Sequence, residues 1–176
     1  MRIGVPKELT PGESRVALAP YAVHELTRAG HRVLVEAGAG DASSIPDQMY
    51  EEAGARVVGE ARRVYDDSEL VVKVYGPVEE EYEYLREGLI LFSFLSLPVN
   101  PGLMQALLGS RCVAFAMETI RDARGRLPVL APMSEIAGRL TPQIGAHYLQ
   151  RPSGGRGATW VADPAASDDP PRGMRR

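Results

Sequence analysis

The chain has 176 residues, of which 44% are hydrophobic, and this is enough for one domain with a substantial core followed by a tail. A formal net charge of -3 excludes any general attraction to nucleic acid or to anionic lipid, so neither is expected as a partner. No stretch approaches the roughly 18 to 20 apolar residues of a membrane span. The lone cysteine, Cys112, cannot build a disulfide framework, and its apolar neighbours favour the core of a cytoplasmic protein.

The expected strands are short runs of apolar residues. In chain order they are residues 3–5, 32–36, 69–74, 89–94 and 112–116. The apolar residues in these runs are continuous rather than alternating, which is typical of parallel strands covered on both faces. The sequence therefore predicts a mostly parallel sheet.

Helical patterns lie between these strands. One begins at Pro20 and ends before Gly30, another begins near Pro46 and Asp47, and a third is capped by Asn100. The residues of the third helix that are expected to face inward are Leu103, Met104, Leu107 and Leu108. Alternating strands and helices predict right-handed crossovers, and therefore a doubly wound α/β fold of the Rossmann-like or flavodoxin-like kind.

The chain is expected to have three segments. Residues 1–131 form the α/β domain, and residues 132–150 form a long helix that leads toward a second domain, which is absent here. Residues 151–176 are rich in Gly, Pro, Asp and Arg and show no apolar period. This composition predicts a disordered tail or a frame-shifted reading.

Polar residues follow several of the expected strands. Ligands of open α/β sheets gather beyond the carboxyl ends of the strands, so these residues are candidates for a site. Arginine there suits a carboxylate, because its planar fork makes two parallel charge-assisted bonds. The alternative is that the basic side chains are solvated or paired with Glu8, Glu13 or Glu118. The candidates are Lys7, Glu8, Arg15, Lys73, Tyr75, Ser96, Glu118 and Thr119.

Other motifs point to structure rather than chemistry. The segment from Gly38 to Ser43 begins like a dinucleotide fingerprint, but it lacks the third glycine and a helix directly behind it, so it is interpreted as a turn. The three histidines are not spaced for a metal or a catalytic triad, and no metal site is predicted. The acidic run Glu79, Glu80, Glu81 and Glu83 is interpreted as the solvated start of a helix.

Several separated motifs resemble the N-terminal domain of the alanine dehydrogenase and NAD(P) transhydrogenase α-subunit family. They are MRIGVPKELTPGESRVALAP, GAGAGD, LVVKVYGP, METIRDARGRLPVLAPMSEIAGRL and GGRG, in one register from Met1 to about Gly157. The resemblance implies a two-domain oxidoreductase whose NAD or NADP is held mainly by a second, Rossmann-type domain. It also implies that Arg15 binds the carboxylate of an amino or keto acid, and that Ser134 approaches the cofactor.

Two positions depart from the family pattern. Tyr75 stands where the family has a substrate-binding lysine, and Ser96 stands where it has the acid/base histidine. A phenol near pH about 7 carries no positive charge, and a serine without a base does not accept a proton as histidine does. The resemblance therefore assigns Arg15 and Tyr75 to substrate binding, and no catalytic residue is predicted.

Three hypotheses remain open from the sequence. The first is the substrate-side domain of an enzyme that interconverts L-alanine and pyruvate, inactive alone and binding its cofactor only weakly. The second is a domain of the transhydrogenase α subunit, which SFLSLPVNPGLM resembles more closely. The third is a non-catalytic binding or assembly module. A homo-oligomer is expected, as is a partnership with a separate nucleotide-binding half.

Overall fold

A computed structural model describes residues 1–157. The fold centres on a six-stranded sheet in which every pair is parallel, with the strand order β3-β2-β1-β4-β5-β6. This is the Rossmann order and not the flavodoxin order, and it confirms the predicted doubly wound α/β class. The strands are β1 Arg2–Val5, β2 Arg32–Glu36, β3 Arg56–Val58, β4 Leu70–Tyr75, β5 Ile90–Phe94 and β6 Val113–Ala116.

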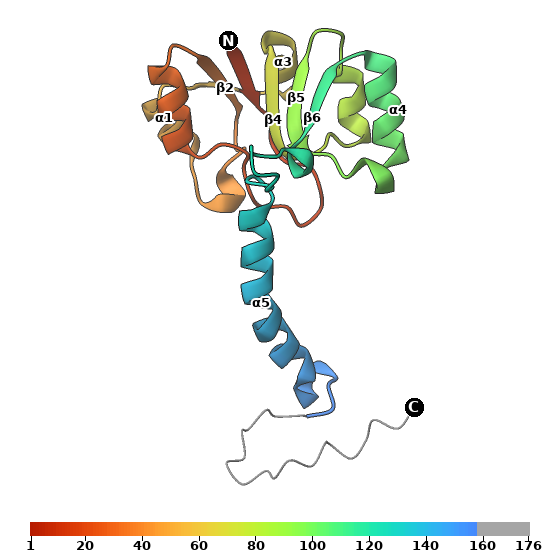
Figure 1. Ribbon diagram of the computed structural model, residues 1–176. Helices are drawn as coiled ribbons and strands as arrows, with labels where there is room; N and C mark the ends of the chain where they lie inside the picture. Colours follow the sequence, from red (N-terminus) through yellow and green to blue (C-terminus); the bar gives the residue numbers. More distant parts are fainter. Residues whose placement is uncertain (158–176) are drawn as a thin grey trace. The chain divides into compact units, whose positions relative to one another are not determined.

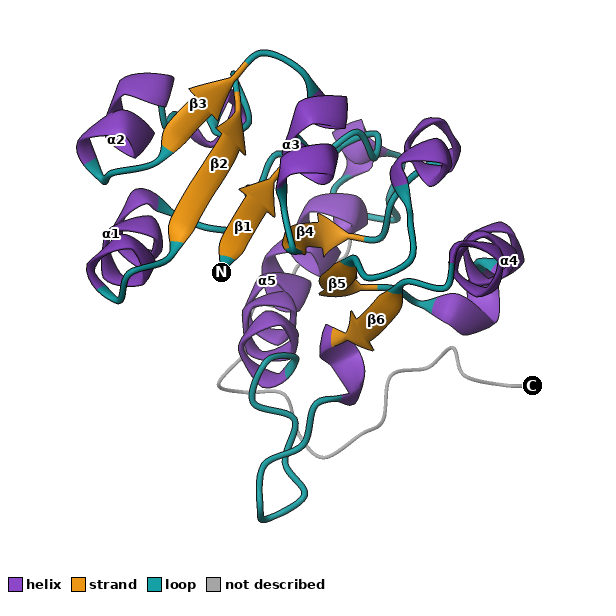
Figure 2. Ribbon diagram, turned by 90° about the horizontal axis from the view of Figure 1, so that it is seen from above, coloured by secondary structure: helices purple, strands orange, loops and turns teal. Residues whose placement is uncertain are grey.

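Helices cover both faces of the sheet (Figures 1 and 2). Helices α1 and α2 pack on one face beside β1, β2 and β3, and α3, the 3-10 helix η2 and α4 lie on the other. A second compact unit begins at Ala131 and contains the long helix α5. The helical bounds are α1 Pro20–Arg28, α2 Asp47–Glu52, α3 Ala61–Asp67, η2 Glu79–Tyr84, α4 Pro101–Ser110, η4 Met117–Thr119 and α5 Ala131–Leu149.

Local signals in the sequence explain the helix ends. Pro20 is the first residue of α1, and Gly30 adopts a φ of +85° just after the helix ends. The side-chain oxygen of Asn100 accepts a hydrogen bond from the backbone N–H of Leu103, which caps α4 as predicted. The predicted inward face of α4 is wrong in part. Leu103 and Leu107 are buried, whereas Met104 and Leu108 are exposed, because this helix packs against the domain on a single narrow stripe.

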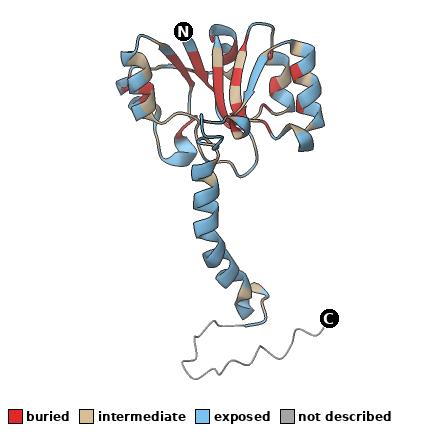
Figure 3. Ribbon diagram, in the orientation of Figure 1, coloured by how far each residue is buried: buried red, intermediate tan, exposed pale blue. Residues whose placement is uncertain are grey.

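The core consists mainly of two apolar clusters, one on each face of the sheet. Figure 3 shows that buried residues gather on the strands of the sheet. Val5, Val35 and Tyr50 belong to the cluster under α1 and α2, and Leu91 and Leu103 belong to the cluster under α4. Cys112 is partly buried against the second cluster. The central strands are therefore covered on both faces, as their continuous apolar sequences predicted.

The edge strand β6 departs from that prediction. Val113 and Phe115 are 50% and 51% exposed, although the apolar run was expected to be buried. Strand β6 pairs only with β5, and so its outer edge has no neighbouring strand among the described residues.

Strand β3 and helix α3 were not predicted at all. The tail was predicted for residues 151–176; its first residues include the 3-10 helix η5 Arg151–Ser153, and residues 158–176 lie outside the described residues.

Candidate functional site

The carboxyl ends of β1 and β4 meet where the strand order reverses, and Glu8 joins the two. Its Oε1 atom accepts a hydrogen bond from the backbone N–H of Val74 at 2.6 Å, and its Oε2 atom accepts one from that of Tyr75 at 3.4 Å. Ligands of open α/β sheets bind outside the carboxyl ends of the strands at such a reversal. The loops that follow β1 and β4 are therefore the first place to look for a site.

A buried ion pair lies beside this reversal. The side chain of Lys73 is 1% exposed, and its Nζ donates to both carboxylate oxygens of Glu81 at 2.8 and 2.9 Å. The Tyr65 hydroxyl donates to Glu81 as well, and Glu8 Oε2 lies 3.8 Å from Lys73 Nζ. Burial raises the pKa of Glu8, with Lys73 opposing that rise, and burial also raises the pKa of Tyr65 well above its ordinary value. The positive charge of Lys73 is thus balanced inside the fold by Glu81 and Glu8.

The interpretation of the acidic run as a solvated helix start is wrong for one member. Glu81 is 1% exposed, whereas Glu79, Glu80 and Glu83 are exposed on η2. Its second oxygen also accepts the backbone N–H of Val78 at 2.9 Å. The sequence did contain a signal for this arrangement, because a lysine within the apolar run LVVKVY needs a buried carboxylate nearby.

Arg15, in the loop after β1, makes a two-pronged ion pair with Glu13. Its Nε lies 2.8 Å from Glu13 Oε1, and its Nη2 lies 2.5 Å from Glu13 Oε2. The hydrogen bond from Arg15 lowers the pKa of Glu13, and the same bond raises the pKa of Arg15. The guanidinium carbon lies 5.6 Å from the centroid of the Tyr75 ring. The structure therefore brings Arg15 and Tyr75 together, with Glu13 as the pairing partner that the sequence offered.

Tyr75 and Ser96 line one cleft of about 410 Å³ at the carboxyl ends of β4 and β5. Ser96 is exposed and has a φ of +46°, which is unusual for a residue with a side chain. Its backbone N–H donates to Glu118 Oε1 at 2.7 Å, and the N–H of Leu95 donates to Glu118 Oε2 at 3.2 Å. Glu118 thus fixes the loop after β5 from the loop after β6, and this holds Ser96 at the cleft.

Lys7 and Thr119 do not line this cleft. The backbone oxygen of Lys7 accepts a hydrogen bond from Lys73 Nζ at 3.4 Å, and the hydroxyl of Thr119 donates to the backbone oxygen of Ala116 at 2.8 Å. Ser134 lies on α5 in the second unit and is exposed. The cleft therefore unites Tyr75 with Ser96, and Arg15 reaches it through the Tyr75 ring.

The glycine segment forms a turn, as predicted. The backbone N–H of Gly38 donates to Asp47 Oδ1 at 2.8 Å, and the helix that directly follows the segment is the three-residue 3-10 helix Asp41–Ser43 rather than an α-helix. Among residues 1–157, no group of three His, Cys, Asp or Glu side chains is placed to hold a metal ion. No helix in the same residues is long and apolar enough to cross a membrane.

Strand order and cleft together define the class of the protein. It is a Rossmann-type α/β domain whose candidate site lies at the carboxyl ends of β4 and β5, next to the reversal of the strand order. The chain belongs to the family described as "Alanine dehydrogenase/PNT, N-terminal domain", whose model matches residues 4–137. This confirms the resemblance seen in the sequence motifs.

Relatives and solved structures agree with this assignment. The chain is 50% identical over 157 residues to alanine dehydrogenase of Mycobacterium tuberculosis, covering 89% of this chain and 42% of that protein. It is 48% identical to alanine dehydrogenase of Bacillus subtilis, covering 95% of this chain and 44% of the relative.

Among solved structures, an L-alanine dehydrogenase matches with a TM-score of 0.84 and 43% identity, over 89% of this chain and 43% of that one. A transhydrogenase from Sinorhizobium meliloti matches with a TM-score of 0.65 and 35% identity, over 70% of this chain and 37% of that one. The chain thus spans less than half the length of each of these proteins.

Proposed function

We propose that this chain is the substrate-side domain of an NAD(P)-linked oxidoreductase of the alanine dehydrogenase kind, and that it is inactive alone. The observation that carries the proposal is the grouping of Arg15, Tyr75 and Ser96 at the carboxyl ends of β4 and β5. The cleft volume of about 410 Å³ lies within the range of small-molecule sites. A small amino or keto acid is the substrate class that such a cleft suits.

Arg15 is the residue proposed to bind the substrate carboxylate. Its guanidinium offers five N–H donors in a plane, and this matches the two oxygens of a carboxylate. Glu13 already accepts from two of the guanidinium nitrogens, so a substrate carboxylate would share or replace that contact. Tyr75 would close the other side of the guanidinium with its ring, and its phenol would add a neutral hydrogen-bonding group where the family has a lysine.

The described residues do not by themselves fit a dinucleotide. In the glycine turn the N–H of Gly38 already donates a hydrogen bond to Asp47, and no α-helix begins at that turn to bind a pyrophosphate. Ser134 is the contact proposed for the cofactor from this chain. The nicotinamide cofactor would therefore depend mainly on a further, Rossmann-type domain, as the resemblance in the sequence implies.

Binding of pyruvate to the 176-residue chain tests the proposal. Calorimetric titration is expected to show saturable binding, and Arg15→Gln is expected to weaken it by about tenfold or more, because a charge-assisted pair is lost. Arg28→Gln is the matched control, since Arg28 is an exposed arginine on α1. Equal affinities for the wild-type chain and Arg15→Gln would refute the assignment of Arg15.

Two other functions give different results. The structural match at TM-score 0.65 supports a transhydrogenase domain as the second function. Such a domain would bind neither pyruvate nor L-alanine but would give binding heat with a nicotinamide dinucleotide. A non-catalytic assembly module, which the replacements at Tyr75 and Ser96 favour, would self-associate without heat from any of these ligands. NAD-dependent turnover of alanine by the purified chain would contradict the proposed inactivity.

A further inference from the structure

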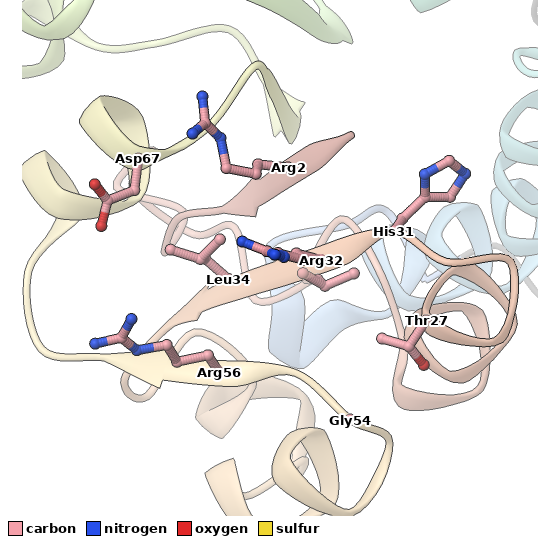
Figure 4. A pocket seen from close by; sticks show the side chains of 9 residues that line it. Arg2, Thr27, His31, Arg32, Leu34, Gly54, Arg56 and Asp67 are labelled. Atoms are coloured by element: carbon pink, nitrogen blue, oxygen red, sulfur yellow. The ribbon is translucent and has the colours of Figure 1, made fainter.

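A hollow of about 390 Å³ lies at the amino ends of β1, β2 and β3, and it is separate from the cleft. Three arginines border it, each the first residue of its strand: Arg2, Arg32 and Arg56. Figure 4 shows their side chains around Leu34, with Asp67 of α3 facing the same space. None of these residues lines the cleft at the carboxyl ends of β4 and β5.

The strand register places the three arginines on one face of the sheet. Arg2 is the direct partner of Arg32, and Arg56 is the direct partner of Leu34. Neighbouring partners in a sheet point to the same side, as do residues two apart in one strand, so all four side chains share a face. Leu34 is 7% exposed and forms an apolar floor beneath the charged groups.

This arrangement concentrates positive charge at one place on the surface. Within residues 1–157, none of the three guanidinium groups forms an ion pair, and the one carboxylate that lines the hollow, Asp67, pairs with Arg63 of its own helix at 3.5 Å. Strands lie only about 4.8 Å apart, and like charges directly opposite each other are destabilising. An anion bound between the arginines would relieve that repulsion, in a chain whose net charge is -3.

We propose that this hollow binds a small phosphorylated anion. Guanidinium groups bind phosphate oxygens in two-pronged geometry, and three of them match the several oxygens of one phosphate group. The hollow is larger than a phosphate needs, and its apolar floor at Leu34 suits an organic part, which points to a phosphomonoester. His31 also lines the hollow, and its buried Nδ1 has no hydrogen-bond partner among the described residues.

Calorimetric titration of the 176-residue chain with glycerol 3-phosphate, beside inorganic phosphate, tests this site. Saturable binding is expected, and the double variant Arg32→Gln/Arg56→Gln is expected to bind about tenfold more weakly or worse, because two charged hydrogen-bonding groups are lost. Arg111→Gln, an exposed arginine paired with Glu87, is the control and should bind as the wild-type chain does. Stronger binding of glycerol 3-phosphate than of phosphate assigns a phosphomonoester, and equal binding assigns free phosphate to the same site.

The melting temperature is a second measurement, which distinguishes loss of binding from unfolding of the variants. Glycerol 3-phosphate is expected to raise the melting temperature of the wild-type chain and of Arg111→Gln, but not that of the double variant, since only a ligand of the folded state stabilises it. Pyruvate binding should be unchanged in the double variant, which separates this site from the proposed substrate cleft. Equal affinity in the double variant, no saturable binding of either probe, or binding only of a DNA duplex would overturn the proposal.

Discussion

Lys73 is a buried cation that balances the charge of the buried carboxylate of Glu81. Replacing it with methionine leaves Glu81 buried without its cation, and removal of one partner from a buried pair costs about 3–5 kcal/mol. Lys73→Met is therefore expected to lower the free energy of unfolding by that amount, as measured by urea denaturation. Lys7→Met is the control, because Lys7 is exposed, and it should change stability by less than about 0.5 kcal/mol.

The double variant Lys73→Met/Glu81→Gln sharpens this test. Removing both charges leaves Glu8, whose Oε2 lies 3.8 Å from Lys73 Nζ, as the remaining buried carboxylate, so only part of the loss in Lys73→Met should be recovered. If the single and double variants were equally unstable, the ion pair would not be the cause. The Tyr65 hydroxyl can still hydrogen-bond to the amide that replaces Glu81.

The ion pair between Glu13 and Arg15 makes a pH-dependent contribution to stability. Its hydrogen bond from Arg15 lowers the pKa of Glu13 below 4.5, so the stabilisation is complete above that value and is lost as the pH falls through the lower pKa of the folded state. The Arg15 side chain is 39% exposed, and solvent screening limits the effect to below about 1 kcal/mol.

Glu13→Gln is expected to remove this part of the acid sensitivity. Urea denaturation at pH about 6 and about 3 should show a smaller difference in the variant than in the wild-type chain. The variant should also bind pyruvate more tightly if Arg15 holds the substrate, because a competing carboxylate has been removed. An unchanged pH difference would contradict the linkage.

Residue-level prediction from the sequence worked where topology alone decides the outcome. Arg15 and Tyr75 meet because the loops after β1 and β4 are neighbours at the strand reversal, and parallel pairing fixes this. The choice of Glu81 as the partner of Lys73 was not predictable in the same way. It depends on how η2 turns one of four nearby carboxylates inward, and neither charge nor spacing distinguishes those four in the sequence.

At the scale of elements, the turn after β2 shows why glycines recur there. A Cβ on Gly40 would lie 2.5 Å from the backbone oxygen of Ile45 and 2.9 Å from the Tyr50 ring. Gly40→Ala is expected to lower the free energy of unfolding by about 1–3 kcal/mol, because backbone or core must shift. Thermal and urea denaturation would measure this change.

A matched glycine separates close packing from general loss of glycine. A Cβ on Gly59 would meet no other atom within 4 Å, and Gly59 has no positive φ. Gly59→Ala should therefore leave stability unchanged or raise it by up to about 1 kcal/mol. A neutral Gly40→Ala would show that the turn has room, and it would reopen the comparison with a ligand-binding loop.

The elements that the sequence failed to predict include the shortest strand, which lies at an edge of the sheet. Strand β3 has only three residues, Arg56–Val58, and it gains its identity from pairing with β2 rather than from an apolar pattern. Strand β6 was predicted, but it was expected to be buried and is largely exposed, because an apolar sequence does not distinguish a central strand from an edge strand. Long runs such as those of β4 and β5 carried enough signal to be placed correctly.

At the scale of the whole molecule, the two ends of the sheet have different chemistry. The carboxyl ends of the strands form a cleft that contains Tyr75 and Ser96. At the amino ends lie three arginines that form no ion pair within residues 1–157. This separation of the two sites follows from the parallel sheet, because all strands begin at one end of it and finish at the other. The chain matches 42% of the length of the alanine dehydrogenase of M. tuberculosis.

The replacements at the cleft can be tested in a protein of full length. We expect that residues 1–157 joined to the remaining part of B. subtilis alanine dehydrogenase would oxidise L-alanine poorly, because Ser96 supplies no proton acceptor. Adding Tyr75→Lys and Ser96→His should raise kcat by about 10²–10⁴-fold, the usual contribution of general acid–base catalysis, measured as NADH formation.

The control for this gain is Ser44→His, since Ser44 is also exposed and has a φ of +59° but lies outside the cleft. That variant should leave kcat unchanged, which would show that a histidine acts only at position 96. High activity of the hybrid with Ser96 in place would instead mean that another group accepts the proton, and the role inferred for this position would fail.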